Sequence, residues 1–166
     1  MNIHEKNYVV ISAHQAKNTK TQNALLQAKL AYDLLNLVKF DTFISPATGR
    51  YNGIDEESFA VAMPDENSPN FDRIQDGLIA LGNKYNQNCL LLVFQYDPPT
   101  ACLYPLNRDI QEGHTDYIEN PWIEISDTSG VQDFTTVQGV SFIIDYSSDV
   151  TPPEFQSLDA LLELLT

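Results

Sequence analysis

The chain has 166 residues, of which 43% are hydrophobic, and its formal net charge is −14. This length favours one domain with a single core and is too short for two ordinary domains. The first 16 residues form neither a signal peptide nor a transit peptide, and no apolar run is long enough to span a membrane. We therefore expect one cytoplasmic domain over residues 1–166 without a membrane partner, with a core at 7–105 and an acidic C-terminal extension at 106–166.

The negative charge is concentrated in the last third of the chain. Residues 1–108 contain nine Lys and Arg against eleven acidic residues, whereas residues 109–166 contain twelve acidic residues and no Lys or Arg. Without cations to neutralise phosphate, this segment would repel nucleic acid, so we expect no nucleic-acid partner. Solubility, a saline habitat or mimicry of DNA phosphates would each explain the charge.

The first predicted elements are a strand, a helix and a second strand. Residues 8–13 are a β-branched apolar run that ends at polar residues, as in a buried strand. Thr19 or Thr21 can cap the helix that follows. Its apolar stripe consists of Leu26, Leu30, Leu34 and Leu37 or Val38, widened by Leu25 and Leu35. A second strand over 40–44 should end at Ser45-Pro46, because proline disfavours its continuation.

A glycine-containing loop after Pro46 and a strand starting at Glu56 form the candidate site, with Tyr51 in the loop. Because strand side chains alternate, one face carries Glu57, Phe59, Val61 and Met63, and the other carries Glu56, Ser58, Ala60 and Ala62. The small residues of the second face leave room for a ligand or another subunit, which favours Glu56 over Glu57 as the working acid. The alternative is a solvated acidic turn.

The remaining pattern completes a two-layer fold. A second helix is predicted from Ser68-Pro69, with an apolar stripe of Phe71, Ile74, Leu78, Leu81 and Tyr85. Residues 89–94 read as a central strand and 100–104 as its hairpin partner. This order predicts an α+β, ferredoxin-like (PII-like) fold, with two helices packed on an antiparallel or mixed sheet. Further strands are expected around 117–125 and 140–146, and a terminal helix after Pro152-Pro153.

Most chemical motifs are absent. The sequence contains no phosphate-binding loop, no dinucleotide-binding glycine motif and no zinc-protease motif. A calcium loop around Gly113 fails because Arg108 falls on the first ligand position. Ser12, His14 and His114 lack the spacing of a hydrolase or metal site. Cys89 and Cys102 lie in apolar runs and read as core residues, so we expect no metal and no cofactor.

Five short segments resemble one known family in their order and approximate spacing. They are the first strand at 8–13, Thr48-Gly49-Arg50-Tyr51, the acid pair before Ser58-Phe59-Ala60-Val61, the strand at 87–93, and Thr100-Ala101-Cys102-Leu103-Tyr104. In these features the chain resembles the S-adenosylmethionine lyases, formerly called hydrolases, of bacteriophages. The resemblance covers residues 8 to about 104.

The resemblance implies cleavage of S-adenosylmethionine into methylthioadenosine and homoserine lactone, as a means of counteracting host restriction-modification. It implies that Tyr51 contacts the substrate and that Glu56 faces the sulfonium or orients the reacting end, with Glu57 as the alternative acid. Ser12, Ala13 and His14 would line the substrate pocket, together with Thr48 and Gly49 of the loop. The family is trimeric with sites between subunits, which implies a homotrimer in the host cytoplasm.

Three other functions stay open at this point. One is a lyase that degrades an adenylylated form of S-adenosylmethionine. Another is an acidic DNA mimic that blocks a restriction enzyme through the extension at 109–166. The third is a sensor that binds S-adenosylmethionine without cleaving it.

Overall fold

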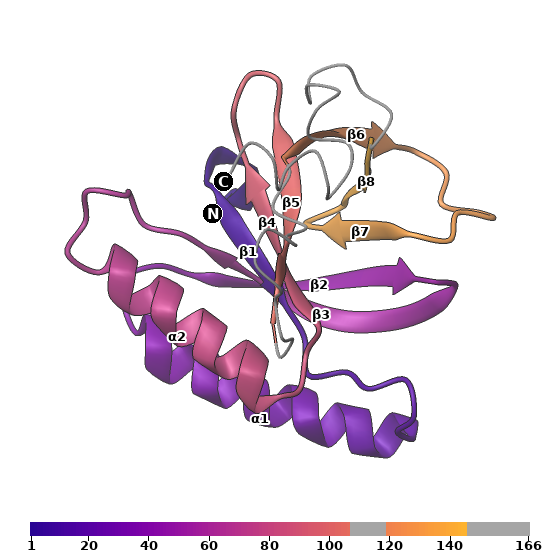
Figure 1. The fold of residues 1–166 in the computed structure, drawn as a ribbon, viewed down its shortest axis with the longest axis horizontal. Coiled ribbons are helices and arrows are strands. Elements are labelled where there is room, and N and C mark those ends of the chain that lie inside the picture. The colour runs from indigo at the N-terminus through magenta and orange to yellow at the C-terminus, as the bar shows by residue number, and fades with distance from the viewer. Residues whose placement is uncertain (107–118, 146–166) are drawn as a thin grey trace, which may run out of the picture.

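The computed structural model describes residues 1–106 and 119–145, in which eight antiparallel strands form a closed barrel (Figure 1). The strand order around the barrel is β1-β3-β2-β7-β8-β6-β5-β4, and β4 pairs with β1 to complete the circle. In chain order the elements are η1 (Ile3–Glu5), β1 (Tyr8–Ile11), α1 (Lys20–Val38), β2 (Ile44–Tyr51), β3 (Ile54–Ala62), α2 (Phe71–Lys84), β4 (Cys89–Phe94), β5 (Thr100–Pro105), β6 (Asn120–Ile125), β7 (Phe134–Val137) and β8 (Val140–Ile144).

The expected open, ferredoxin-like sheet is wrong. The order strand-helix-strand-strand-helix-strand is present up to β4, but the two edges of such a sheet are not free. β7 pairs with β2 and β5 pairs with β4, and β8 and β6 connect them. Closure satisfies the N–H and C=O groups that edge strands would leave unpaired, which explains why the later strands complete a barrel.

The predicted loop after Pro46 is instead a long β-hairpin of β2 and β3. Pro46 pairs opposite Phe59 of β3, but the pairing of β2 with β7 begins only at Ala47. Pro46 therefore has one neighbouring strand rather than two, a position that tolerates a missing N–H. Asn52 and Gly53 have φ angles of 52° and 77°, the pair of positive values that a type I′ hairpin turn requires.

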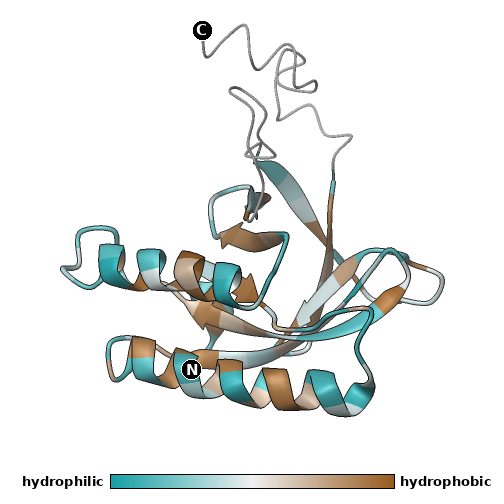
Figure 2. Ribbon diagram, turned by 60° about the horizontal axis from the view of Figure 1, so that its bottom comes forward, coloured by the Kyte–Doolittle hydropathy of each residue, from teal (hydrophilic) through white to brown (hydrophobic). Residues whose placement is uncertain are grey.

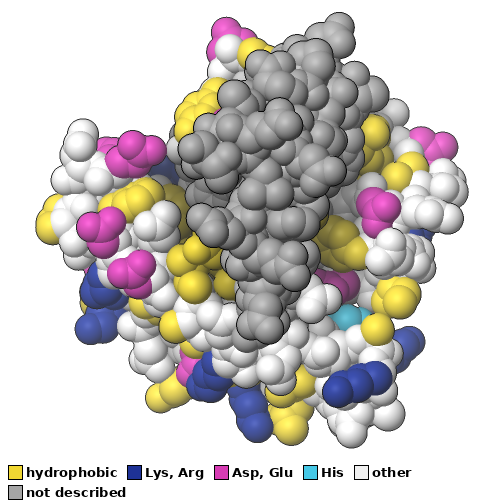
Figure 3. Space-filling model, viewed as in Figure 1, with side chains coloured by type: hydrophobic (Ala, Val, Ile, Leu, Met, Phe, Trp, Pro, Cys, Tyr) yellow, Lys and Arg dark blue, Asp and Glu magenta, His cyan; other side chains and the backbone are white. Residues whose placement is uncertain are grey.

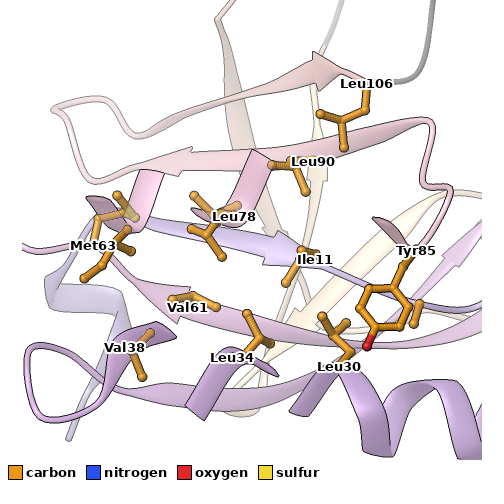
Figure 4. Close-up of a cluster of buried hydrophobic side chains, with 13 residues drawn as sticks. Ile11, Leu30, Leu34, Val38, Val61, Met63, Leu78, Tyr85, Leu90 and Leu106 are labelled. Atoms are coloured by element: carbon orange, nitrogen blue, oxygen red, sulfur yellow. The ribbon is translucent and has the colours of Figure 1, made fainter. Parts of the chain in front are cut away.

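Both helices pack on the outer face of β1, β3 and β4 (Figures 1 and 2). Thr19, one of the two predicted caps, accepts a hydrogen bond from the Gln22 amide in a capping box. The predicted stripes are confirmed at their centres, but Leu25 and Leu35 are 58% and 62% exposed. The buried core between helices and sheet is drawn in Figure 4 and includes Val9, Ile11, Leu30, Leu34, Val38, Val61, Met63, Ile74, Leu78, Tyr85 and Leu90.

The barrel interior has its own core of small and aromatic side chains. Ala47, Ala60, Ala62 and Ala101 leave the space that larger rings occupy. The rings of Trp122 and Phe142 lie 4.9 Å apart, and Tyr8 and Phe142 are each 1% exposed. Part of the predicted acidic extension therefore belongs to the barrel, because it provides β6, β7 and β8.

Several sequence predictions are settled or fall outside the described residues. Cys102 is buried, Cys89 is half-buried, and the two do not form a disulfide bond. The terminal helix expected after Pro152-Pro153 lies outside the described residues, as does much of the acidic extension. No helix in the described ranges is long and apolar enough to cross a membrane.

Candidate active site

Glu56 lies in a row of residues that runs across three neighbouring strands. It pairs with Gly49 of β2, and Gly49 pairs with Thr135 of β7. Directly paired residues point to the same side of a sheet, and on β3 that side continues through Ser58 and Ala60 into the barrel interior. The predicted division of β3 into two faces is thus confirmed.

The small residues on the Glu56 face do not form an external surface. Ala60 and Ala62 are fully buried inside the barrel, and Ser58 is 3% exposed. They are therefore not available to a neighbouring subunit, contrary to the expectation that this face would admit one. Glu56 is half-buried, so it is the member of this face that stays within reach of a ligand.

Tyr51 folds back over Gly49 at the same end of the barrel. A Cβ atom at position 49 would lie 2.7 Å from Tyr51 Oη and 2.9 Å from the Phe134 carbonyl oxygen, so the tyrosine can occupy this position only above a glycine. The Tyr51 hydroxyl is 2.8 Å from Thr135 Oγ1. Burial raises the Tyr51 pKa to about 12, so the phenol stays neutral and can donate a hydrogen bond.

Burial also changes the pKa of the Glu56 carboxyl group. It raises the Glu56 pKa from 4.5 to about 7, although the nearby Ser12 hydroxyl opposes the shift. Glu56 therefore changes charge near neutral pH, which is unusual for a carboxyl group and frequent at functional sites. The Ser12 hydroxyl donates its proton to the Glu57 carbonyl oxygen at 2.6 Å, which fixes the end of β1 against β3.

The segment after β1 is held by its backbone. The Ala13 amide donates to Gln27 Oε1 at 2.7 Å, while its side chain is buried in the core under the helices. The His14 amide donates to Ser12 Oγ at 3.0 Å, and its carbonyl oxygen accepts from Gln87 Nε2 at 3.2 Å. Of these three predicted pocket residues, Ser12 is the one whose side chain affects the Glu56 pKa.

Thr48 and Glu57 lie away from this group. They pair with each other across β2 and β3, on the face opposite to Gly49 and Glu56, and both are exposed. The structure therefore brings together Glu56, Tyr51, Gly49 and Ser12, and separates Thr48 and Glu57 from them. The choice between the two acids remains a prediction, now supported by a difference in burial.

Three hydroxyl groups of this region were not predicted as site residues. Thr135 comes from β7, and no local pattern connects it to Tyr51. The Tyr8 hydroxyl and Ser58 Oγ are buried and have no hydrogen-bond partner in the described part of the chain. Burial, with a smaller contribution from Tyr51, raises the Tyr8 pKa far above its usual value. The interior of the barrel thus contains unused hydrogen-bonding capacity close to the site.

The described residues contain no group of three or more His, Cys, Asp or Glu placed to hold a metal ion. A groove of about 820 Å³ lies elsewhere, between α1 and Tyr85, and is not lined by Tyr51 or Glu56. The site described above is thus defined by side-chain chemistry and burial rather than by this groove.

Comparison with known proteins supplies one match. The model of the S-Adenosylmethionine lyase family matches residues 9–144, more than four-fifths of the chain. The matched range includes β2, β3 and β7 and all of β1 except Tyr8, and these strands carry the site. No curated protein matches the sequence.

Proposed function

Since the chain belongs to the S-adenosylmethionine lyase family, we propose that it cleaves S-adenosylmethionine to methylthioadenosine and homoserine lactone. The observation that carries the proposal is the half-buried Glu56 beside the neutral Tyr51, on one inward-facing row of the barrel. An anionic carboxylate attracts the cationic substrate, and the phenol supplies a hydrogen-bond donor.

The reaction needs no nucleophile from the protein. One oxygen of the substrate's own carboxylate forms a bond to its γ-carbon while the bond from this carbon to sulfur breaks. The electron pair of that bond stays on sulfur, so the sulfonium becomes a neutral thioether and the carboxylate becomes a lactone, with no proton transferred. The protein's task is to hold the chain folded with the carboxylate behind the γ-carbon.

The positive and negative charges of the two reacting groups decrease together during the reaction. Partial burial of the site can therefore favour the reaction. The sulfonium and the carboxylate lose part of their charges in the transition state, so a site that solvates them poorly disfavours the substrate more than the transition state. Attraction between Glu56 and the sulfonium would weaken as the reaction proceeds, whereas attraction to the α-ammonium group persists. The ammonium contact is therefore the role of Glu56 that orients the reacting end without opposing the chemistry.

Tyr51 has the complementary role in this proposal. Its hydroxyl is fixed by Thr135 and by the absence of a side chain at Gly49. A neutral phenol can donate to the substrate or contact the adenine ring with its face. Ser12 acts through Glu56 as a positioning residue, because its hydroxyl holds the Glu57 backbone and favours the charged form of the Glu56 carboxyl group, which lowers its pKa.

The resemblance to the phage enzymes extends the proposal to the assembly and the biological role. We expect a homotrimer with sites between subunits, acting in the host cytoplasm to deplete S-adenosylmethionine and so to counteract restriction-modification. No cofactor takes part in the proposed reaction.

Incubation of the purified protein with S-adenosylmethionine, followed by mass spectrometry, tests the activity directly. We expect methylthioadenosine and homoserine lactone in equal amounts. Glu56→Gln should lower kcat/KM by at least about 100-fold, the scale of losing one preorganised electrostatic contact. Glu57→Gln is the matched control, because it makes the same change on the exposed face. Absence of product from a folded wild-type protein would refute the proposed function, and loss with Glu57→Gln alone would reassign the acid.

A further inference from the structure

A second region of the molecule has the shape and charge of a ligand site. The groove of about 820 Å³ lies between the first half of α1, the segment before it, and the end of α2. We call it the lysine groove and define it by Gln15, Lys17, Lys29, Tyr32, Lys84 and Asn86. Its volume falls in the range of small-molecule sites, about 300–1,000 Å³. It is lined by residues of the helices and their flanking segments, whereas Glu56 faces the barrel interior.

The floor of the lysine groove is a connected hydrogen-bond network. Gln15 Nε2 donates to the Tyr85 carbonyl oxygen at 3.0 Å and to the Asn86 carbonyl oxygen at 3.2 Å. The Gln15 backbone exchanges two further hydrogen bonds with the Asn23 side chain. This network fixes the segment before α1 against the end of α2, so the groove is formed without a ligand.

One acidic residue, Asp33, lines the lysine groove, and its negative charge is balanced by an ion pair with Lys84. Asp33 Oδ2 accepts from Lys84 Nζ at 2.8 Å and from the Tyr85 hydroxyl at 2.7 Å. These two hydrogen bonds hold the Asp33 pKa below its usual value, so the carboxylate stays ionised and its pair with Lys84 persists. The pair leaves Lys17 and Lys29 as excess positive charge.

The excess charge is unusual in this chain. Three of its nine Lys and Arg line the groove, although the whole chain carries −14. Lys17 and Lys29 are exposed and make no ion pair within the described ranges. Figure 3 shows the face of the molecule that is seen in Figure 1. Most of the Lys and Arg side chains visible on it lie along the lower side, where both helices lie in Figure 1. A positive groove on a negative protein selects an anion by its local field.

An aromatic ring lines the same groove as these two lysines. Tyr32 of α1 is 68% exposed. Leu26 and Ala28 also line the groove, so an apolar wall adjoins the cations. Lysines bind phosphate as point charges, and exposed aromatic rings stack on nucleobases. An anion with a planar ring would use both parts of the groove.

We propose that the lysine groove binds a nucleoside polyphosphate, with its phosphates between Lys17 and Lys29 and its base against Tyr32. This site is separate from the one assigned to S-adenosylmethionine and does not depend on the proposed lyase activity. The chemistry of the groove defines the class of ligand and leaves the base unspecified.

Calorimetric titration of the full chain with ATP tests the proposal, with adenosine and tripolyphosphate as partial ligands. We expect saturable binding of one ATP per chain, and weaker binding of both partial ligands. Lys17→Gln with Lys29→Gln should weaken ATP binding by at least about tenfold. Tyr32→Ala should weaken the binding of ATP but not of tripolyphosphate. The matched control is Lys6→Gln with Lys39→Asn, which removes the same charge from exposed positions outside the groove.

Four outcomes would overturn the proposal. The first is no saturable ATP binding up to about 1 mM. The second is equal weakening by the groove and control pairs, which would indicate diffuse electrostatics. The third is displacement of ATP by S-adenosylmethionine, or loss of ATP binding in Glu56→Gln, which would place ATP in the barrel site. The fourth is tighter binding of a polyglutamate peptide that displaces ATP, which would assign the groove to an acidic protein segment.

Discussion

Replacing Glu56 by Gln should make the protein inactive and, above neutral pH, more stable. The half-buried carboxyl group has a pKa of about 7 in the folded protein, because burial disfavours its charged form. In the unfolded chain the same group ionises near its ordinary pKa of 4.5. A glutamine has nearly the same shape and never becomes charged, so it removes the cost of burying the anion.

The direction in which pH changes the free energy of unfolding follows from proton binding. Between pH 4.5 and about 7 the folded protein keeps a proton on Glu56 that the unfolded chain releases, so raising the pH favours unfolding. The free energy of unfolding is therefore least affected below pH 4.5, falls as the pH rises through 7, and stays lowered above it. At about 1.4 kcal/mol per pH unit, the difference between the two pKa values corresponds to about 3 kcal/mol. Partial exposure of the side chain makes this an upper estimate.

Thermal unfolding of the wild type and Glu56→Gln at a series of pH values measures this effect. For a chain of this length, about 3 kcal/mol corresponds to a difference in Tm of about 6–12 °C. The variant should have the higher Tm at pH 8.5, and the two curves should converge toward pH 4.5. Glu57→Gln is the control, because Glu57 is exposed and should leave the difference near zero.

The same titration should appear in the kinetics. If the anion of Glu56 holds the substrate, kcat/KM rises with pH through about 7, because this parameter reports the free enzyme. A variant that is less stable than the wild type at every pH would refute the argument from burial. A kcat/KM that stays constant between pH 6 and 8 would show that the charge of Glu56 is not used.

Three further substitutions test the surroundings of the acid. Gly49→Ala should lower the activity, the Tm and the free energy of unfolding, the last by about 1–3 kcal/mol, because its Cβ would collide with Tyr51 and with the Phe134 carbonyl oxygen. Thermal unfolding and the product assay measure these effects, and values equal to wild type would contradict the close contact. Tyr51→Phe should cost about 1 kcal/mol in denaturant unfolding, because it removes the hydrogen bond to Thr135, and a stability equal to wild type would show that this bond contributes nothing. Tyr8→Phe should leave Tm unchanged or raise it, since the hydroxyl has no partner in the described residues, whereas a loss of more than about 1 kcal/mol would reveal a partner such as bound water.

Local patterns predicted the local structure well. The stripe of α2 places Ile74 and Leu78 in the core, and the alternation along β3 correctly assigns Glu56 and Glu57 to opposite faces. Both predictions depend on periodicity within one element, where side-chain direction follows from backbone geometry alone.

The errors arose in strand pairing, once in a local hairpin and once between distant segments. Pro46 suggested the end of a strand, but it lies where β2 has a neighbour on one side only. The Asn52-Gly53 pair, a strong signal for a two-residue hairpin, would have identified β2 and β3 as one unit. Closure of the barrel had no local signal, because it depends on the pairing of the short strand β7 with β2, which lies far away in the chain.

The dependence of the site on β7 has a kinetic consequence. The hydroxyl groups of Tyr51 and Thr135 meet across 84 positions of sequence, and contacts between distant segments form slowly because the intervening chain must first lose its freedom. The helices and the β2–β3 hairpin rely on local contacts and should form first. During refolding, activity should therefore return later than helical circular dichroism, and the delay would measure how long the barrel takes to close around the row of Glu56, Gly49 and Thr135.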